Sequence, residues 1–284
     1  MKLYHQWWLA SLIFIFAIVG FLAAVSWQSN HPIVRQDEEL TVVPPPLVQV
    51  LLAFGDRYLA ADIAVVRSLL NPLKDDGYDH FRSQAKIQLD ASMMNPRHED
   101  NYYIAAALLS WSGHVEEAKT ILRRAAEGRS FDMLPPLYLG FDYFYFEHDS
   151  ILGANWMYQA ALRADSEQNR TSLSRIASRW LERGEDAREA LKVLDAMRTQ
   201  ARGVALKAYL AQRGERLKAL VILQDSARAY YIRFGKPLGT IDDLLKVGIL
   251  TRLPLDPAQL GFYLDASGMP QLRQPPFNGA PPPR

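Results

Sequence analysis

The stretch Ala118-Lys119-Thr120-Ile121-Leu122-Arg123-Arg124-Ala125 contains the pattern that decides the fold. A small residue is followed four positions later by a bulky apolar one and, three positions after that, by another small or medium-sized one. Residues with this spacing lie on one face of a helix, and the small residue lets a partner helix approach closely. The pattern occurs at Ala85/Leu89/Ser92, Ala118/Leu122/Ala125, Ala154/Tyr158/Ala161 and Ala190/Leu194/Met197. Successive first alanines are 33, 36 and 36 residues apart, which predicts a repeated helical hairpin with this face on its second helix.

Each of the last three units is preceded by a stretch that predicts the first helix of its hairpin. Ala106, Gly140 and Ala177 are the small residues at which we expect the first helices to cross the second ones. The dipeptide Gly113-His114 and the tripeptide Gly184-Glu185-Asp186 supply turns between the two helices.

At these residues the chain resembles the tetratricopeptide repeats (TPRs), whose period is about 34 residues. Leu137-Tyr138-Leu139-Gly140 matches that pattern best, and Asn95-Pro96-Arg97 resembles its closing proline. The 36-residue spacings depart from the pattern by two-residue insertions. The resemblance implies a TPR-like α-solenoid, which we expect over residues 47–214. With the apolar run before it and the different segment after it, the chain is expected to have a mainly α fold: an N-terminal transmembrane helix, the solenoid, and a small α+β C-terminal cap. Irregular antiparallel helical packing without true repeats is the alternative.

An apolar run near the amino terminus determines the expected compartment. Residues 7–27 contain no charged residue and no proline, and they approach the roughly 20 residues that a helix needs to cross a bilayer. Trp7, Trp8 and Trp27 stand where an interfacial aromatic belt would place them. The alternative is a cleaved signal peptide ending near Ser26, although its apolar core would exceed the usual length of about 7 to 15 residues.

Charge predicts the orientation of this transmembrane anchor. Lys2 lies in the expected cytoplasmic start, residues 1–6, whereas the acidic run Asp37-Glu38-Glu39 follows the span. In a bacterium this orientation predicts a single-pass protein of the inner membrane with the bulk of the chain in the periplasm.

A spacer is expected to separate the anchor from the folded part. Residues 28–46 are polar at first and end in Pro44-Pro45-Pro46, a composition typical of a semi-rigid linker. Residues 47–70 are rich in Leu, Val, Ala and Ile, so we expect one helix of about six turns there. Asn71-Pro72 is its stop signal.

The C-terminal part begins with further helices. Residues 204–213 and 217–234 predict two of them. Thr240 and Asp243 then form a capping box, a hydroxyl followed three residues later by a carboxylate, which predicts a short helix closed by Gly248.

A small hairpin is expected after that helix. Residues 261–264 and 269–272 predict its strands, and Pro270 places the second strand at an edge because proline cannot donate a ladder hydrogen bond. Residues 215–273 are therefore expected to form a long helix plus a small module. The Pro-rich tail, residues 274–284, is expected to be disordered.

This segment resembles the soluble part of the pseudopilins of type II secretion and type IV pilus systems. The resemblance rests on residues 229–235 and 241–250, on Pro254, and on Asp256-Pro257. It departs where Pro237-Leu238 replaces the expected Tyr-Pro, and no prepilin peptidase site precedes the apolar run, so we interpret it as a borrowed module. The whole arrangement resembles a group of bacterial membrane-anchored tetratricopeptide proteins.

Composition argues against several classes of function. Lys and Arg number 32 against 31 Asp and Glu, so the formal net charge is +1 and no global field favours binding to nucleic acid. The chain has no cysteine, which excludes disulfides and thiol nucleophiles. Its six histidines never stand at zinc-site spacing, and no Gly-rich phosphate loop or nucleophile elbow occurs. We therefore expect no catalytic residue, no metal and no cofactor.

Two acidic features invite a functional interpretation. Asp75-Asp76-Gly77-Tyr78-Asp79 resembles the start of a calcium loop but lacks the later glutamate, so a polar turn is the simpler interpretation. Asp62 lies on an otherwise apolar helix. We expect it to be a buried partner for an arginine or a helix-end amide, because an unpaired buried charge is costly.

One aromatic feature is a candidate site. In the repeat register set by Ala106 and Gly140, the tetratricopeptide geometry implies that eight residues face a concave groove: Tyr103, Ala107, Ser110, Trp111, Leu137, Phe141, Phe144 and Tyr145. Such a groove suits an extended or helical peptide, since aromatic anchors give contact area at low entropic cost. Alternatively, residues 141–146 fill the core between hairpins or are covered by the C-terminal module.

These features predict a non-enzymatic scaffold or assembly factor that is tethered to the lipid bilayer through residues 7–27. Its partner would be a protein of a cell-envelope machine for secretion, pilus assembly or polymer export. The alternative is an accessory structural subunit of a larger inner-membrane complex, enzymatic through its other subunits. A catalytic activity of the chain itself ranks third.

Overall fold

The computed structural model describes residues 14, 16–23, 26, 43–70 and 78–274, and it confirms a mainly helical protein. The chain divides into two compact units, Met1–Val42 and Val43–Arg284. In the first unit, residues 16–23 are helical. Within the part of the chain that the structure describes, no helix is both long enough and apolar enough to cross a membrane. The expected anchor lies largely outside the described residues.

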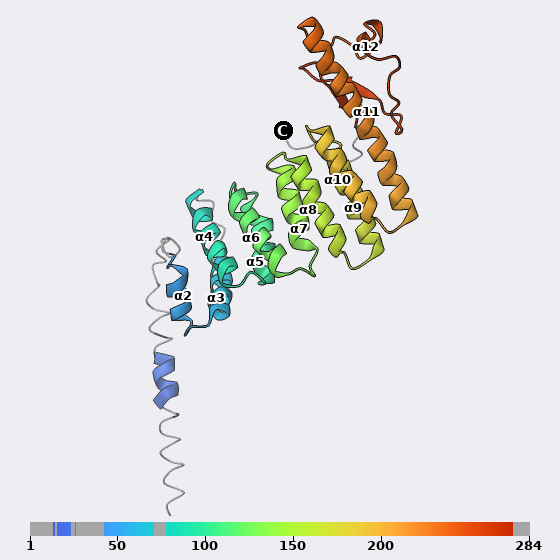
Figure 1. Cartoon of the computed structure of the whole chain (residues 1–284). Coiled ribbons are helices and arrows are strands. Elements are labelled where there is room, and N and C mark those ends of the chain that lie inside the picture. The colour runs from blue at the N-terminus through green and yellow to red at the C-terminus, as the bar shows by residue number, and fades with distance from the viewer. Residues whose placement is uncertain (1–13, 15, 24–25, 27–42, 71–77, 275–284) are drawn as a thin grey trace, which may run out of the picture. The chain divides into compact units, whose positions relative to one another are not determined.

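The second unit is a succession of helices followed by a small sheet (Figure 1). In chain order they are α2 (Pro46–Leu52), α3 (Arg57–Leu70), α4 (Tyr78–Met94), α5 (Glu99–Ile104), the π-helix η1 (Ala105–Leu109), α6 (Val115–Gly128), α7 (Leu134–Tyr145), α8 (Ser150–Arg163), α9 (Glu167–Leu181), α10 (Ala187–Gln200), α11 (Val204–Phe234), α12 (Asp243–Lys246), β1 (Phe262–Leu264) and β2 (Pro270–Leu272).

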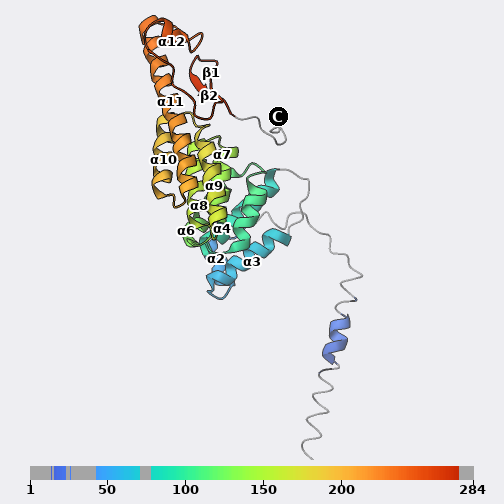
Figure 2. The same cartoon turned by 90° about the vertical axis from the view of Figure 1, so that its right-hand side faces the viewer.

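Neighbours in the chain are mostly neighbours in space. Helix α3 packs on α4, α6 on α7, α7 on α8, α8 on α9 and α10 on α11. Contacts also join the next-but-one helices α4 and α6, α8 and α10, and α9 and α11. The helices therefore follow one another in chain order, which can be traced in two perpendicular views (Figures 1 and 2).

The repeated face predicted from the sequence is the buried face of α4, α6, α8 and α10. Every residue of the four units is buried except Leu89, which is partly buried against the core. Ala118, Ala154 and Ala190 have no exposed surface at all. The small residue of each unit therefore lies where packing is tightest, as its spacing indicates.

The predicted close crossing at Gly140 is confirmed. A Cβ on Gly140 in α7 would lie 2.8 Å from the carbonyl oxygen of Gly153 and 2.8 Å from the backbone nitrogen of Met157, both in α8. A Cβ on Gly153 would likewise lie 2.9 Å from the carbonyl oxygen of Gly140. The two backbones meet at facing glycines, because any side chain there would force the helices apart.

The single helix expected over residues 47–70 is wrong, because the chain turns between α2 and α3. Phe54 and Gly55 both have positive φ, 56° and 86°, which ends α2. The Asp56 carboxylate then accepts hydrogen bonds from backbone N–H groups two and three residues later and so caps α3. Glycine followed by aspartate is a stop-and-start signal that outweighs the continuous apolar composition.

The two helices expected over residues 204–213 and 217–234 are one continuous helix, α11. Gly214, where we expected a break, is buried against α10, and a Cβ there would meet its nearest atom, on Leu194, at 3.7 Å. One interior glycine costs a helix only about 1 kcal/mol relative to alanine. Packing on α10 offsets that cost, and the expected boundary between residues 214 and 215 falls inside the helix.

The C-terminal module packs against the second half of α11. Its hairpin is confirmed, with antiparallel β1 and β2 paired from Phe262 with Leu272 to Leu264 with Pro270. The capping box forms in part: the Thr240 N–H donates to the Asp243 carboxylate at 2.8 Å, but α12 begins only at Asp243.

A buried ion network joins this module to the preceding helices. The fully buried Arg216 of α11 lies 2.7 Å from the Glu182 carboxylate, after α9, and 3.0 Å from the Asp256 carboxylate of the module. Its guanidinium also donates to the carbonyl oxygen of Arg273, and Arg213 contacts Glu182 at 2.6 Å. Two buried carboxylates are thus paired with two arginines, as burial of charge requires.

Candidate functional site

Four aromatic rings gather where α7 ends beside the turn before α6. Phe141 and Tyr145 stack with ring centroids 5.3 Å apart. Trp111 lies 6.3 and 5.4 Å from these two rings, and Phe146 meets its indole edge-on at 5.1 Å. Trp111 nevertheless remains 59% exposed. This Trp111 cluster therefore presents a large ring to solvent while three neighbouring rings hold it in place.

A π-helical turn sets the direction in which Trp111 projects. Residues Ala105–Leu109 form η1, whose wider turns shift the register of the following residues. Ala105 is fully buried, whereas Ala106, the expected crossing residue, is only partly buried. The expected crossing position is corrected by one residue. Ser110 then faces inward and Trp111 outward.

Asp142 is a buried carboxyl in the middle of the aromatic run. It is 2% exposed and accepts a hydrogen bond of 2.9 Å from the Ser110 hydroxyl. Burial raises the pKa of Asp142 to about 7, because the Ser110 hydrogen bond and the nearby Lys119 offset only part of the lost hydration. The Ser110–Asp142 contact ties the end of the π-helical turn to α7.

Lys119 ties α6 to the end of α7. Its ammonium group lies 2.6 Å from the Glu116 carboxylate, 3.0 Å from the Glu147 carboxylate and 4.9 Å from the centre of the Tyr143 ring. Burial acts to lower the pKa of Lys119, but the hydrogen bonds to Glu116 and Glu147 outweigh it and raise the pKa. Lys119 thus stays charged and fixes the segment that carries the Trp111 cluster.

The structure brings only part of the expected groove together. Trp111, Phe141 and Tyr145 contact one another, but Phe144 stacks instead on Trp180 of α9, with centroids 4.2 Å apart. Leu137 packs against the core between the later helices.

The remaining predicted residues add no ring to the Trp111 cluster. Tyr103 is partly buried and has its ring 6.1 Å from that of Tyr138. Ala107 is exposed, and Ser110 is buried. Phe146 is a cluster member that the groove register did not include, because it lies just past the end of α7.

The expectation for Asp62 is wrong. Its side chain is exposed, and its carboxylate lies 3.2 Å from Nε2 of His98. Ala60, Ala61 and Ala64 form the buried face of α3 instead. Of the calcium-like stretch, Asp75-Asp76-Gly77 falls outside the described residues, and Tyr78-Asp79 begins α4. Apart from Gln274, the Pro-rich tail also falls outside the described residues.

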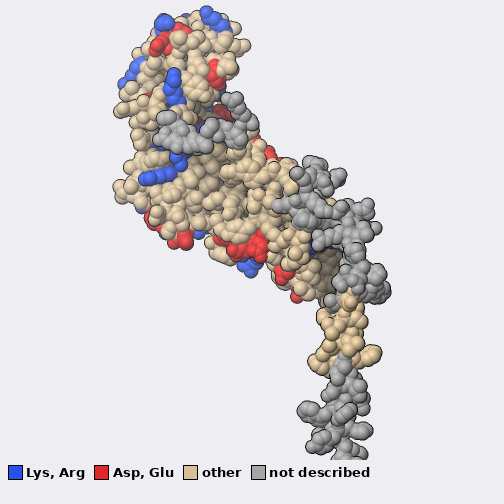
Figure 3. Space-filling model, turned by 180° about the vertical axis from the view of Figure 1, so that it is seen from behind, with Lys and Arg blue, Asp and Glu red and all other residues tan. Residues whose placement is uncertain are grey.

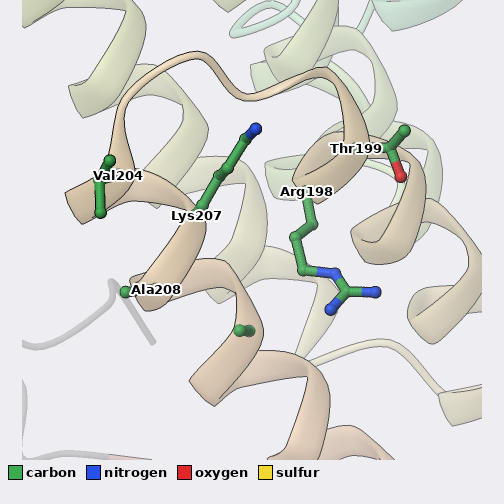
Figure 4. Close-up of a pocket in the computed structure, with 6 residues that line it drawn as sticks. Arg198, Thr199, Val204, Lys207 and Ala208 are labelled. Carbon is green, nitrogen blue, oxygen red and sulfur yellow. The ribbon is translucent and has the colours of Figure 1, made fainter.

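A hollow of about 450 Å³ lies at the junction of α10 and α11 (Figure 4). Its lining residues are Arg198, Thr199, Val204, Lys207, Ala208 and Ala211. The two cationic side chains project from different helices in different directions (Figure 4), and Arg198 pairs with Asp195 at 3.3 Å. Small-molecule sites instead place a few polar groups so that they converge.

Charge does not single out a site on the face seen in Figure 3. The middle of that face carries few charged side chains, with acidic groups gathered along its lower edge (Figure 3). Among the described residues, the Trp111 cluster is the best-defined candidate for recognition, and its four rings make that candidate largely apolar.

Comparison with protein-family models, with curated proteins and with solved structures finds no match to this chain.

Proposed function

We propose that this chain is a non-enzymatic scaffold that binds a protein partner through the Trp111 cluster. The observation that carries the proposal is Trp111 itself, a 59% exposed indole packed against three other rings. Tryptophan and tyrosine are enriched among residues that dominate binding energy. A ring already held in place loses little side-chain entropy when a partner covers it.

The helices form a TPR-like array in this proposal. Two observations support it: the same buried face recurs at spacings of 33 and 36 residues, and next-but-one helices pack together at three places. Stacked helical hairpins of this kind build extended surfaces that bind peptides and proteins. The buried contacts of Asp142 and Lys119 would keep the cluster rigid within that surface.

The proposed scaffold is anchored in a bacterial inner membrane by residues 7–27, with the helical array in the periplasm. This part of the proposal rests on the uncharged apolar run and on the charge difference across it. Partners would belong to a secretion, pilus or polymer-export machine.

The test compares full-length Trp111→Ala with wild type in affinity purification from native membranes. We expect partner affinity to fall about 30-fold, because loss of a hot-spot aromatic costs about 2 kcal/mol or more. The free energy of unfolding should fall by only about 1.5 kcal/mol, because each of the three ring pairs of this 59% exposed indole contributes near the low end of about 0.5 to 1.5 kcal/mol. A core tryptophan would cost about 3 to 5 kcal/mol.

Phe131→Ala is the matched control, because Phe131 is also well exposed and its ring faces only Arg129, at 5.0 Å. Equal partner recovery in both variants would contradict the proposal. If wild type instead purifies in a fixed stoichiometric complex that survives Trp111→Ala, the accessory-subunit alternative is correct.

A further inference from the structure

Helix α3 buries its small apolar residues and exposes most of its large ones. Its small residues, such as Ala61 and Ala64, are buried. Its large apolar residues Ile63, Val66 and Leu70 are each exposed by more than half. With Leu59, these three follow the spacing i, i+4, i+7 and i+11, so they form one stripe along the helix. The helix thus turns its larger hydrophobic face away from the protein.

Helix α2 and the turn after it continue this apolar surface. Leu51 and Leu52 are about two-thirds exposed or more, and Phe54 is 97% exposed in the positive-φ turn. A hollow of about 130 Å³ is lined by residues of both helices, including Leu52 and Ile63. A surface with this many neighbouring, exposed, large apolar side chains is rare in soluble monomers and indicates a docking surface.

The surface carries little charge that a partner could recognise. Four charged residues occur in residues 43–70, two of each sign. Asp56 caps α3, and the Arg57 guanidinium donates to the carbonyl oxygen of Met94 at 2.6 Å. An occupant of this surface must therefore be apolar.

Chain connectivity identifies the occupant. Residues 28–45 join the proposed anchor to α2, and a fully extended chain of that length spans at most about 65 Å. Helices α2 and α3 would therefore stay close to the bilayer that holds the anchor. Because the linker limits the distance, the effective concentration of lipid at these helices is high. Burial of exposed Leu, Ile and Phe side chains among headgroups and acyl chains is favourable.

We propose that the α2–α3 face, residues 47–70, lies in the interfacial region of the lipid bilayer as a second membrane contact. This inference rests on the anchor of the proposed function and adds a lipid-binding surface to it. The second contact would hold the first helical pair against the membrane instead of leaving the array on a loose tether.

The experiment uses the absence of native cysteine. Full-length Phe54→Cys and Ile63→Cys are labelled with an environment-sensitive fluorophore and reconstituted in phosphatidylcholine vesicles containing nitroxide-bearing lipid. We expect a blue-shifted emission and about twofold or stronger quenching by the lipid nitroxide, as for an apolar face buried about 5 to 10 Å into the interface. Leu255→Cys is the control, because Leu255 is exposed in the C-terminal module and should be quenched only by aqueous iodide.

Two outcomes overturn the inference. Iodide quenching at positions 54 and 63 equal to that at 255 would show a face open to water. A blue shift without lipid quenching would show that protein covers this face. If the blue shift varies with the protein-to-lipid ratio, the occupant is a second copy of the chain. If the blue shift persists in detergent, the occupant is the chain's own apolar run. Carbonate extraction tests the anchor separately. If carbonate releases the chain although the lipid nitroxide quenches both probes, the anchor is wrong and the interfacial contact stands.

Discussion

At the scale of single residues, Asp142 makes the stability of the fold depend on pH. Its pKa is raised from an ordinary 3.8 to about 7, so between these values the folded chain binds more protons than the unfolded chain. The contribution of Asp142 to stability therefore falls as pH rises from about 4 through about 7. Asp142→Asn keeps an acceptor for Ser110 and removes the ionisation. We expect the variant to be more stable than wild type near pH 8, by at most about 4 kcal/mol, and similar near pH 4.

Urea unfolding followed by circular dichroism across this pH range measures the effect. Glu127→Gln serves as the control, because it removes one carboxyl group from an exposed position of α6. A constant difference between wild type and Asp142→Asn at every pH would show that Asp142 ionises normally.

Sequence reasoning found three members of the Trp111 cluster but not the buried Ser110–Asp142 contact beside it. The tetratricopeptide resemblance implied that Trp111, Phe141 and Tyr145 lie together, and it also put Ser110 on the same surface. Ser110, directly after the π-helical turn, is buried instead of facing the groove. The alanines and leucines of this turn do not distinguish it from an α-helix. Asp142 was overlooked because a single carboxylate in an aromatic run matches no motif of catalysis or binding.

At the scale of elements, the crossing of α7 and α8 is limited by backbone contact. A Cβ at Gly140 would lie 2.8 Å from two backbone atoms of α8, so Gly140→Ala should cost about 1 to 3 kcal/mol of unfolding free energy through overpacking. The gain in helix propensity, about 1 kcal/mol, does not offset it. Thermal and urea unfolding of the full-length chain in detergent measure the change.

Gly214→Ala is the matched control, since a Cβ there has its nearest neighbour at 3.7 Å. It should raise stability by up to about 1 kcal/mol, because only the propensity gain remains. Equal effects of the two substitutions would mean that α7 and α8 do not approach at Gly140.

The elements that sequence reasoning predicted well are those with a repeated apolar face. The faces containing Ala118, Ala154 and Ala190 were found because helical spacing and burial agree there. Helix ends were harder, because local signals compete with composition. Phe54-Gly55-Asp56 stops a helix in an apolar stretch, whereas Gly214 fails to stop one because packing on α10 carries α11 through it.

At the scale of the whole molecule, Arg216 links the C-terminal module to the preceding helices through buried ion pairs. Arg216→Ala leaves the buried carboxylates of Glu182 and Asp256 without this partner. We expect a loss of about 3 to 5 kcal/mol of unfolding free energy, because an uncompensated buried charge is costly. Hydrogen exchange should also show faster exchange in β1 and β2 than in α8.

Arg188→Ala removes an exposed ion pair with Asp225 and should cost about 1 kcal/mol or less. A similar small loss for Arg216→Ala would show that the network does not attach the module. Sequence reasoning recognised Asp256-Pro257 as a turn, and Asp256 accepts backbone hydrogen bonds from Ala258, Leu260 and Gly261 there. Its ion-pair partner Arg216, however, lies 40 residues away, beyond any local pattern.

The central claim is a membrane-tethered scaffold with its helical array outside the cytoplasm, and a single cysteine tests it most directly. Ser172→Cys places one thiol on the exposed surface of α9 in a chain that has no other cysteine. In spheroplasts, we expect a membrane-impermeant maleimide to label this thiol on an intact, membrane-bound chain. Labelling only after lysis would reverse the orientation, and recovery of a soluble, labelled chain without its first 26 residues would replace the anchor with a signal peptide.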